Sequence, residues 1–213
     1  MLYIQSFTFN PFQENTYLLI NDKKECWIVD PGMYDNNETK FLTDYIGKHQ
    51  LSPQAIINTH AHLDHIFGIQ PLIDIYKIPF GLHKTETSVL TYAPASAAMF
   101  GVSLSKVPQP VFFIDEHKPL QLGDDTIEVR FAPGHSPGSI VFYYAPGSWV
   151  VGGDVLFSGS IGRTDLPGGD FETLINSIRT QLLTLPDNTT VYSGHGPATT
   201  IGTERTHNPF LQP

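Results

Sequence analysis

The stretch Thr59-His60-Ala61-His62-Leu63-Asp64-His65 shapes every inference about this chain, because it places four potential metal ligands within six positions. Side chains alternate in an extended segment, so His60 and His62 project to the same side and can reach one ion. If the chain then turns into a helix, Asp64 and His65 can offer a carboxylate and an imidazole to a second ion beside the first. The stretch therefore predicts a site for two metals.

The segments before this stretch predict an α/β fold. Apolar runs indicate strands near 2–9, 14–21 and 26–30, then a helix around 37–49 and a strand over 55–59. This last strand leads directly into the histidines. Folds of the α/β class place their functional sites just past the ends of buried strands, so the position of the stretch agrees with its chemistry.

The second half of the chain also contains strands, a helix, a strand and a loop with donor residues. Before it, the Pro/Ala-rich segment from Tyr92 to Pro110 is expected to form short helices and loop. Asp170 can cap a helix whose apolar face continues until Pro186. Two packed sheets flanked by helices are the simplest arrangement of these elements. Strands are predicted over 126–131, 140–144, 149–151 and 189–192.

Three further donors, His135, Asp154 and His195, stand where strands meet glycine-rich loops. Glycine permits the sharp turns and close approach that bring a short side chain to an ion. Asp154 is the natural bridge between two metals, because a carboxylate has two oxygens whereas a neutral imidazole normally ligates through one nitrogen. One metal could then take His60, His62 and His135, and the other Asp64, His65 and His195.

These motifs resemble those of the metallo-β-lactamase fold superfamily, and the resemblance covers nearly the whole chain. They are Thr59 to His65, His135, Asp154 and His195, together with the turn Val29-Asp30-Pro31-Gly32. Within that superfamily the chain is similar to the short hydroxyacylglutathione hydrolase (glyoxalase II)-like group. The segments that carry this similarity are Asn10 to Tyr17, Gly162 to Asp170 and Asn208 to Leu211. The resemblance implies an α/β fold, a four-layer αββα sandwich with its metals at one edge.

The resemblance also sets an expectation about domains. We expect a single metallo-β-lactamase-like domain over residues 1–213, because the chain ends at Pro213, soon after the His195 loop. The full-length thioesterase continues from this point into a helical domain that binds glutathione. We therefore expect the chain to lack the C-terminal helical glutathione-binding domain.

The favoured activity is hydrolysis of thioesters such as S-lactoylglutathione, with Asp64 and Asp154 as catalytic residues. Two divalent metals, zinc first and iron or manganese as alternatives, would lower the pKa of water to about 7 and so supply hydroxide at neutral pH. A thiol has a pKa near 8.5 and leaves with little protonation, whereas an amide nitrogen needs a general acid. These considerations favour thioesters over amides.

Two other activities remain open. Persulfide dioxygenases, which hold one iron, share the histidine motifs and a Gly-Arg-Thr-Asp stretch like Gly162 to Asp165, so a mononuclear iron oxidoreductase is the first alternative. A catalytically inactive, metal-stabilised interaction module is the second. Class B lactamases resemble the chain less, because they generally lack the bridging carboxylate that Asp154 supplies.

Two residues beside the motifs have alternative interpretations. Arg163 is the only arginine or lysine between Arg130 and Arg179, and it could bind a carboxylate of the substrate or form a salt bridge with Asp165 or Asp170. Asp30 could accept a hydrogen bond from a ligating histidine or merely form the turn with Pro31 and Gly32.

Composition limits the partners and the compartment. The formal net charge of -9 and the absence of a Lys/Arg run argue against nucleic acid and anionic membranes. No segment approaches the roughly 20 apolar residues of a membrane span, and the N-terminus does not resemble a signal peptide. We expect a cytoplasmic protein that acts on a small molecule, an anionic thioester, and the sequence leaves its oligomeric state open.

Overall fold

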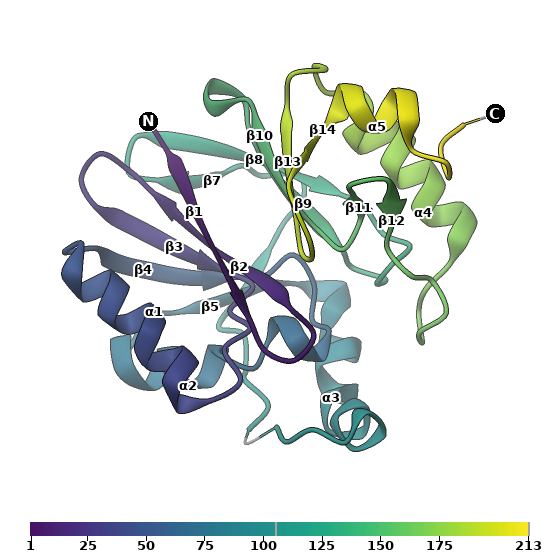
Figure 1. The fold of residues 1–213 in the computed structure, drawn as a ribbon. Coiled ribbons are helices and arrows are strands. Elements are labelled where there is room, and N and C mark those ends of the chain that lie inside the picture. The colour runs from purple at the N-terminus through teal and green to yellow at the C-terminus, as the bar shows by residue number, and fades with distance from the viewer. Residues whose placement is uncertain (105, 213) are drawn as a thin grey trace.

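The computed structural model describes residues 1–104 and 106–212, and their apolar runs form two sheets of six strands each (Figure 1). Ser105 of the expected middle loop and Pro213 of the expected domain lie outside the described residues. The strand order of the first sheet follows the sequence, with antiparallel pairing up to β3 and parallel pairing from there to β6. Its strands are β1 Tyr3–Phe9, β2 Glu14–Ile20, β3 Glu25–Val29, β4 Ser52–Ile57, β5 Phe80–His83 and β6 Phe112–Ile114.

The second sheet has the order β14-β13-β10-β9-β8-β7, in which only the pair β10 and β13 is parallel. Its strands are β7 Leu120–Leu122, β8 Asp125–Phe131, β9 Ile140–Tyr144, β10 Trp149–Gly153, β13 Thr190–Ser193 and β14 Thr199–Thr200. A small hairpin, β11 Leu156–Phe157 and β12 Ser160–Ile161, follows β10.

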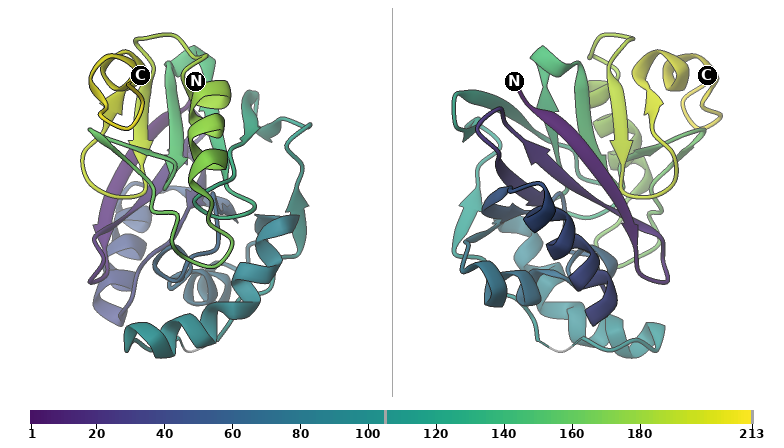
Figure 2. Two further views of the ribbon diagram at one scale, coloured as in Figure 1. Left: turned by 90° about the vertical axis from the view of Figure 1, so that its right-hand side faces the viewer. Right: turned by 60° about the vertical axis from the view of Figure 1, so that its left-hand side comes forward.

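Helices cover both outer faces, as the two rotated views show (Figure 2). Helices α1, α2 and α3 lie on the first sheet, and α4 and α5 lie on the second. Their bounds are α1 Asn36–Lys48, α2 Ile69–Tyr76, α3 Thr87–Phe100, α4 Phe171–Ser177 and α5 Ile201–His207. Short 3₁₀ turns span Leu63–His65, Lys84–Glu86 and Ala145–Gly147, and a π-helical segment, Ile178–Leu182, continues α4.

Alternation along the central strands explains the layers. On β2, Leu18 packs against the helices and Leu19 packs between the sheets, and neither residue is exposed to solvent. On β3, Ile28 likewise packs against the helices and Val29 packs between the sheets. The second sheet contributes side chains such as Phe142 to the core between the sheets. Strands that are buried on both faces are mostly apolar, which is why the sequence shows continuous apolar runs such as Tyr17 to Ile20 on β2. The αββα sandwich predicted from the sequence is confirmed.

Most predicted elements are confirmed, but the middle of the chain is not as expected. Helix α3 begins before Tyr92 and runs for 14 residues with Pro94 inside it, where short helices and loop were expected. Pro94 is exposed, and because it has no backbone N–H it cannot donate the helical hydrogen bond to Leu90, so its place inside α3 costs stability. Asp170 caps α4 as predicted, accepting a hydrogen bond from the Thr173 amide. Every helix among residues 1–104 and 106–212 is too short or too polar to span a bilayer.

Candidate metal centre

The predicted ligands meet at one edge of the sandwich, where loops from both sheets converge. The turn after β4 carries His60 to His65, the loop after β8 carries His135, and the ends of β10 and β13 carry Asp154 and His195. Besides a group of Asp30 with His60 and His65, two groups made only of predicted ligands form there, each with its ligand atoms within 4.8 Å of one another. They are His60, His62 and His135 in the first group, and Asp64, His65 and His195 in the second.

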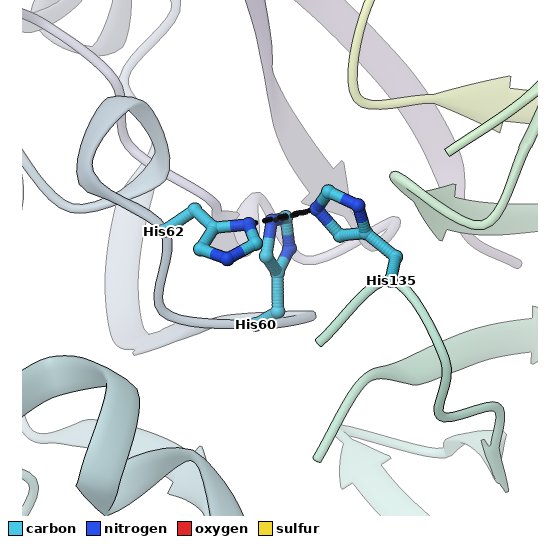
Figure 3. A group of neighbouring side chains, drawn as sticks. All are labelled: His60, His62 and His135. Carbon is cyan, nitrogen blue, oxygen red and sulfur yellow. Dashed lines mark hydrogen bonds between the residues drawn. The ribbon is translucent and has the colours of Figure 1, made fainter. Parts of the chain in front are cut away.

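In the first group the three imidazoles point toward one another (Figure 3). His135 Nε2 lies 3.3 Å from His60 Nε2 and 2.7 Å from His62 Nδ1. Nitrogens that share a tetrahedral zinc at 2.0–2.1 Å lie roughly 3.3 Å apart, so the first distance already matches a metal site and the second is shorter. These three residues fit one tetrahedral ion with a fourth position left for water or substrate.

Asp154 lies between the two groups. Its Oδ2 is 3.6 Å from His135 Nε2 and 3.5 Å from His195 Nε2, and its Oδ1 is 3.4 Å from His65 Nε2. Asp154 Oδ1 and His65 Nε2 are buried and have no hydrogen-bond partner among the described residues. Buried polar atoms without partners are costly, and a shared metal ion would satisfy both of these atoms. The donor set therefore fits two metals with Asp154 as the bridge.

Hydrogen bonds fix the tautomer of the ligating histidines. His135 Nδ1 donates to the Arg163 carbonyl at 2.8 Å, and His195 Nδ1 donates to the Phe12 carbonyl at 3.0 Å. His65 Nδ1 lies 3.2 Å from Asp30 Oδ2. When each imidazole is neutral, its Nε2 keeps the lone pair and faces the other ligands, as metal coordination requires.

Asp30 holds the first histidine as well as His65. Its carboxylate accepts hydrogen bonds from the Thr59 amide at 2.7 Å and from the Thr59 hydroxyl. Thr59 Oγ1 in turn lies 3.0 Å from His60 Nδ1, so it can accept that proton while donating its own to Asp30. Because both oxygens of Asp30 already accept hydrogen bonds, we interpret it as an orienting residue and not as a ligand. The contacts match the first of the two alternatives raised by the sequence.

One glycine is required by the packing of the centre. A Cβ on Gly194 would lie 2.0 Å from Asp154 Oδ1 and 2.8 Å from His65 Cε1. Any larger residue would therefore push the bridging carboxylate out of place. This close approach of the β13 loop to Asp154 is the reason for the glycine next to His195.

Three buried residues that hold the ligand loops were not identified from the sequence. Asn58 Nδ2 donates to the His60 and His65 carbonyls, and Asn15 Nδ2 donates to the carbonyls on either side of the His195 turn. Glu86, which no solvent reaches, is the third. Nothing around Glu86 in the sequence indicates this role, because its partners are 25 to 52 residues away.

Glu86 connects the two loops that supply the first group. One carboxylate oxygen accepts from the Ala61 amide at 2.8 Å, and the other accepts from the Ser136 hydroxyl and the Gly138 amide, both at 2.6 Å. Ala61 lies between His60 and His62, and Ser136 follows His135. One buried carboxylate therefore sets the distance between the ligands of the first group.

Electrostatics separate the two groups. Burial and the neighbouring imidazoles lower the pKa values of His60 and His135, and they lower the pKa of His62 to about 3. Burial also opposes protonation of His65, but Asp154 and Asp64 outweigh it and raise the His65 pKa well above its usual value. The first group is thus neutral and ready to bind a metal at neutral pH, whereas His65 must first lose a proton.

The metal cleft is a cavity of about 410 Å³ that opens over both groups. Beyond the ligands, its wall includes Phe12, Phe100, Phe157 and Arg163. Arg163 is half exposed and pairs with both oxygens of Asp165 at 2.7 Å. It does not pair with Asp170, whose side chain caps α4.

Comparison with known proteins identifies the family. The model of the metallo-beta-lactamase superfamily matches residues 9–195. A probable metallo-hydrolase, YqgX of Bacillus subtilis, is 43% identical over 203 residues, which are 94% of this chain and 93% of the relative. Hydroxyacylglutathione hydrolase GloC of Haemophilus influenzae is 38% identical over 202 residues, with the same coverage of both chains. The chain belongs to the metallo-β-lactamase superfamily, and it is a metal-dependent hydrolase with a His/Asp metal site.

Two solved structures are similarly close. The crystal structure of TTHA1623 in a di-iron-bound form has a TM-score of 0.87 and 39% identity, covering 97% of this chain and 100% of that one. The crystal structure of BLEG-1 B3 metallo-beta-lactamase has a TM-score of 0.92 and 41% identity, covering 99% and 100%. The sequence predicts that class B lactamases resemble the chain less than hydroxyacylglutathione hydrolases do. BLEG-1, at 41% identity, does not fit that expectation.

The difference in protonation predicts that the two metal positions respond differently to pH. A raised pKa means that His65 keeps its proton to a higher pH, so a metal must displace that proton to bind. Below that pKa, affinity at the second position should fall about tenfold per pH unit for each proton displaced, while the first position changes little. Equilibrium dialysis against zinc would measure the number of ions bound per chain. This number should fall from two to one as the pH is lowered from about 8 to about 5. A His195→Gln variant should hold one ion throughout. Loss of both ions at the same pH would contradict the assignment.

Glu86 predicts a second effect. In Glu86→Gln an amide N–H₂ replaces one acceptor and faces N–H or O–H donors, so one of the loop contacts must break. Substitution of residues that orient ligands typically costs 10–100-fold in metal affinity, and we expect about tenfold at the first position. Competition with a chromophoric chelator would measure it. Glu116→Gln, which alters a carboxylate that contacts His83 outside the centre, is the matched control. Unchanged affinity in Glu86→Gln would remove the role of Glu86.

Proposed function

We propose that this chain hydrolyses thioesters at a binuclear metal centre, in a reaction in which a C–O bond to water forms and the C–S bond breaks. The products are a carboxylic acid and a thiol. The single observation that carries the proposal is the composition of the metal cleft. Its wall combines ligands from both metal groups with Arg163 and apolar residues, and among the lining residues it offers no separate general acid.

The missing general acid distinguishes possible leaving groups. Apart from the predicted ligands, Arg163 is the only titratable side chain in the described wall of the cleft, and Asp165 raises its pKa further. It therefore cannot protonate a leaving group. An amine must be protonated as it leaves, but a thiol with a pKa near 8.5 can leave as the thiolate. This contrast favours a thioester.

The residues of the centre have complementary roles in this reaction. When bound, two divalent metals supply hydroxide at neutral pH and polarise the carbonyl of the substrate. His60, His62 and His135 would hold one metal position, and Asp154 would join it to the other. Asp64 Oδ2 lies 3.0 Å from His195 Nε2, so the second position combines an imidazole pair with a carboxylate. Zinc fits these donors, and the di-iron form of TTHA1623 also supports iron.

Two observations favour an anionic substrate. GloC, at 38% identity, is a hydroxyacylglutathione hydrolase, and substrates of that kind carry carboxylates. In a chain with a net charge of -9, Arg163 also places a cation on the wall of the metal cleft. We therefore propose a small anionic thioester as the substrate and infer no role for nucleic acid or membranes.

β-Lactam hydrolysis is the second candidate function. It is favoured by the similarity to BLEG-1, whose structure has 41% sequence identity to this chain and a TM-score of 0.92. A β-lactam is an amide, so its nitrogen leaves less easily than a thiolate when no separate general acid is available. The mononuclear iron dioxygenase remains the alternative within the oxidoreductases, and it would not need the second group of ligands.

The thioesterase proposal predicts activity without oxygen. The metal-loaded protein should hydrolyse S-lactoylglutathione under nitrogen, and removal of metal by a chelator should abolish the activity. His62→Ala should lower metal content at the first position and activity together, whereas His117→Ala, at an exposed histidine outside the cleft, should change neither. Oxygen uptake with glutathione persulfide and a single bound iron, without hydrolysis, would favour the dioxygenase. Faster turnover of a β-lactam than of any thioester would favour the lactamase.

Arg163 and Asp165 together predict the charge preference. If Arg163 binds a carboxylate of the substrate, Arg163→Ala should raise KM for an anionic thioester about tenfold, or about 1.4 kcal/mol, with little change in kcat. Asp165→Asn releases the guanidinium from its partner, so it should leave that KM unchanged or lower it. A neutral thioester should be insensitive to both variants. If both variants weaken charged and neutral substrates equally, Arg163 braces the loop through Asp165 and does not bind substrate.

A further inference from the structure

A second cavity of about 300 Å³, here called the side pocket, lies beside the metal cleft. It is bounded by helix α3 on one side and by the loop around Leu166 to Gly168 on the other. The first metal group borders it through His62. Its lining residues are Ala61, His62, Leu63, Ser88, Val89, Tyr92, Ala93, Ser96, Met99, Pro137, Leu166, Pro167 and Gly168.

The side pocket is apolar. Its only titratable side chains in the described lining are His62, which belongs to the first metal group, and Tyr92. None of the described residues that line the pocket is an aspartate, glutamate, lysine or arginine. Such a cavity can desolvate a hydrocarbon group at little cost, but it offers no partner for a charged one.

The apolar face of α3 is arranged to line this cavity. Val89, Tyr92, Ala93 and Ser96 follow one another at helical spacing along one stripe, and Met99 extends the stripe by a turn. Tyr92 and Met99 remain 48% and 59% exposed, so the core of the protein does not fully use them. Large apolar side chains that stay exposed around a concavity are typical of a binding surface.

The position of the two cavities indicates what could occupy the side pocket. They share His62, Leu63, Ser96 and Leu166 in their walls, so the side pocket lies next to the place where a reacting carbonyl would meet the metals. Arg163 lines only the metal cleft. The walls thus separate a place for an anionic group from a place for an apolar one.

We infer that the side pocket binds an unbranched apolar substituent of the substrate, so that the preferred thioesters carry a hydrocarbon chain as well as an anionic group. This inference rests on the proposed thioesterase function. The chain can come from either side of the thioester bond, the acyl group or the thiol, and the wall suits both. It is the length of this hydrocarbon, more than the identity of the charged end, that the pocket selects.

The test measures how kcat/KM depends on chain length in two series under nitrogen. The first joins acetyl, butanoyl or hexanoyl groups to mercaptoacetate, and the second joins an acetyl group to ethanethiol, butanethiol or hexanethiol. Burial of each added methylene should raise kcat/KM about fourfold until the pocket is full. The series that shows this slope identifies the side of the bond that enters the pocket.

A matched pair of variants on α3 locates the effect. Ser88→Phe adds a ring to the lining of the side pocket at an exposed position, so it should remove the length dependence while the metal content stays unchanged. Ala95→Phe adds the same ring to an exposed position of α3 that lines neither cavity, and it should keep the slope. Flat series in the wild-type protein, or an equal loss of slope in both variants, would overturn the inference.

A binding measurement keeps this inference separate from the proposed function. Straight-chain carboxylates and thiols, the product halves of the two series, are titrated calorimetrically into the metal-loaded protein. The affinity should increase with each methylene. If Ser88→Phe abolishes this increase and Ala95→Phe preserves it, the result would support the side pocket, even if no thioester is hydrolysed. Thioester hydrolysis with no dependence on chain length in either turnover or binding would support the function and overturn the pocket.

Discussion

The crowding of seven polar side chains into one corner, four of them buried and three partly buried, is the constraint on which this structure depends. Imidazoles and carboxylates that leave water lose hydration free energy, and they regain it only through partners placed around them. Asp154 is such a partner, because it lies within 3.6 Å of histidines from both groups. Bound metals would complete the compensation. The loops must therefore hold their side chains closely enough for one carboxylate to contact both groups, and Gly194 shows how little space this leaves.

The two groups show that position, more than residue type, decides chemical state. Both contain histidines that are almost fully buried, yet the pKa shifts of His60 and His65 have opposite signs. His60 faces other imidazoles, which repel a second positive charge, whereas His65 faces Asp64 and Asp154, which attract it. The carboxylates thus create an asymmetric pair of metal positions from similar donors. Such asymmetry allows one position to retain its metal while the other exchanges it.

Much of the centre could be predicted from the sequence, because each ligand belongs to a short local motif. His60, His62, Asp64 and His65 are neighbours in the chain, and their spacing carries the information. The supports could not be predicted in this way. Glu86 contacts Ser136 across 50 residues and Asn15 contacts Ser193 across 178, so only the folded chain brings them together. Helix α3 was missed for a different reason, since Pro94 argues against a helix at this place although the alanines around it favour one.

Helix α3 connects the metal centre to the surface that contacts the substrate. Its N-terminal cap, Glu86, holds the Ala61 amide, and Ala61 itself lines the side pocket between two ligating histidines. Any movement of the helix would therefore change the pocket and the spacing of the first metal group together. A group held against Tyr92 and Met99 contacts the same rigid body that positions His60 and His62. Binding free energy gained away from the reacting carbonyl can thus orient that carbonyl, which is how remote contacts raise kcat as well as lower KM.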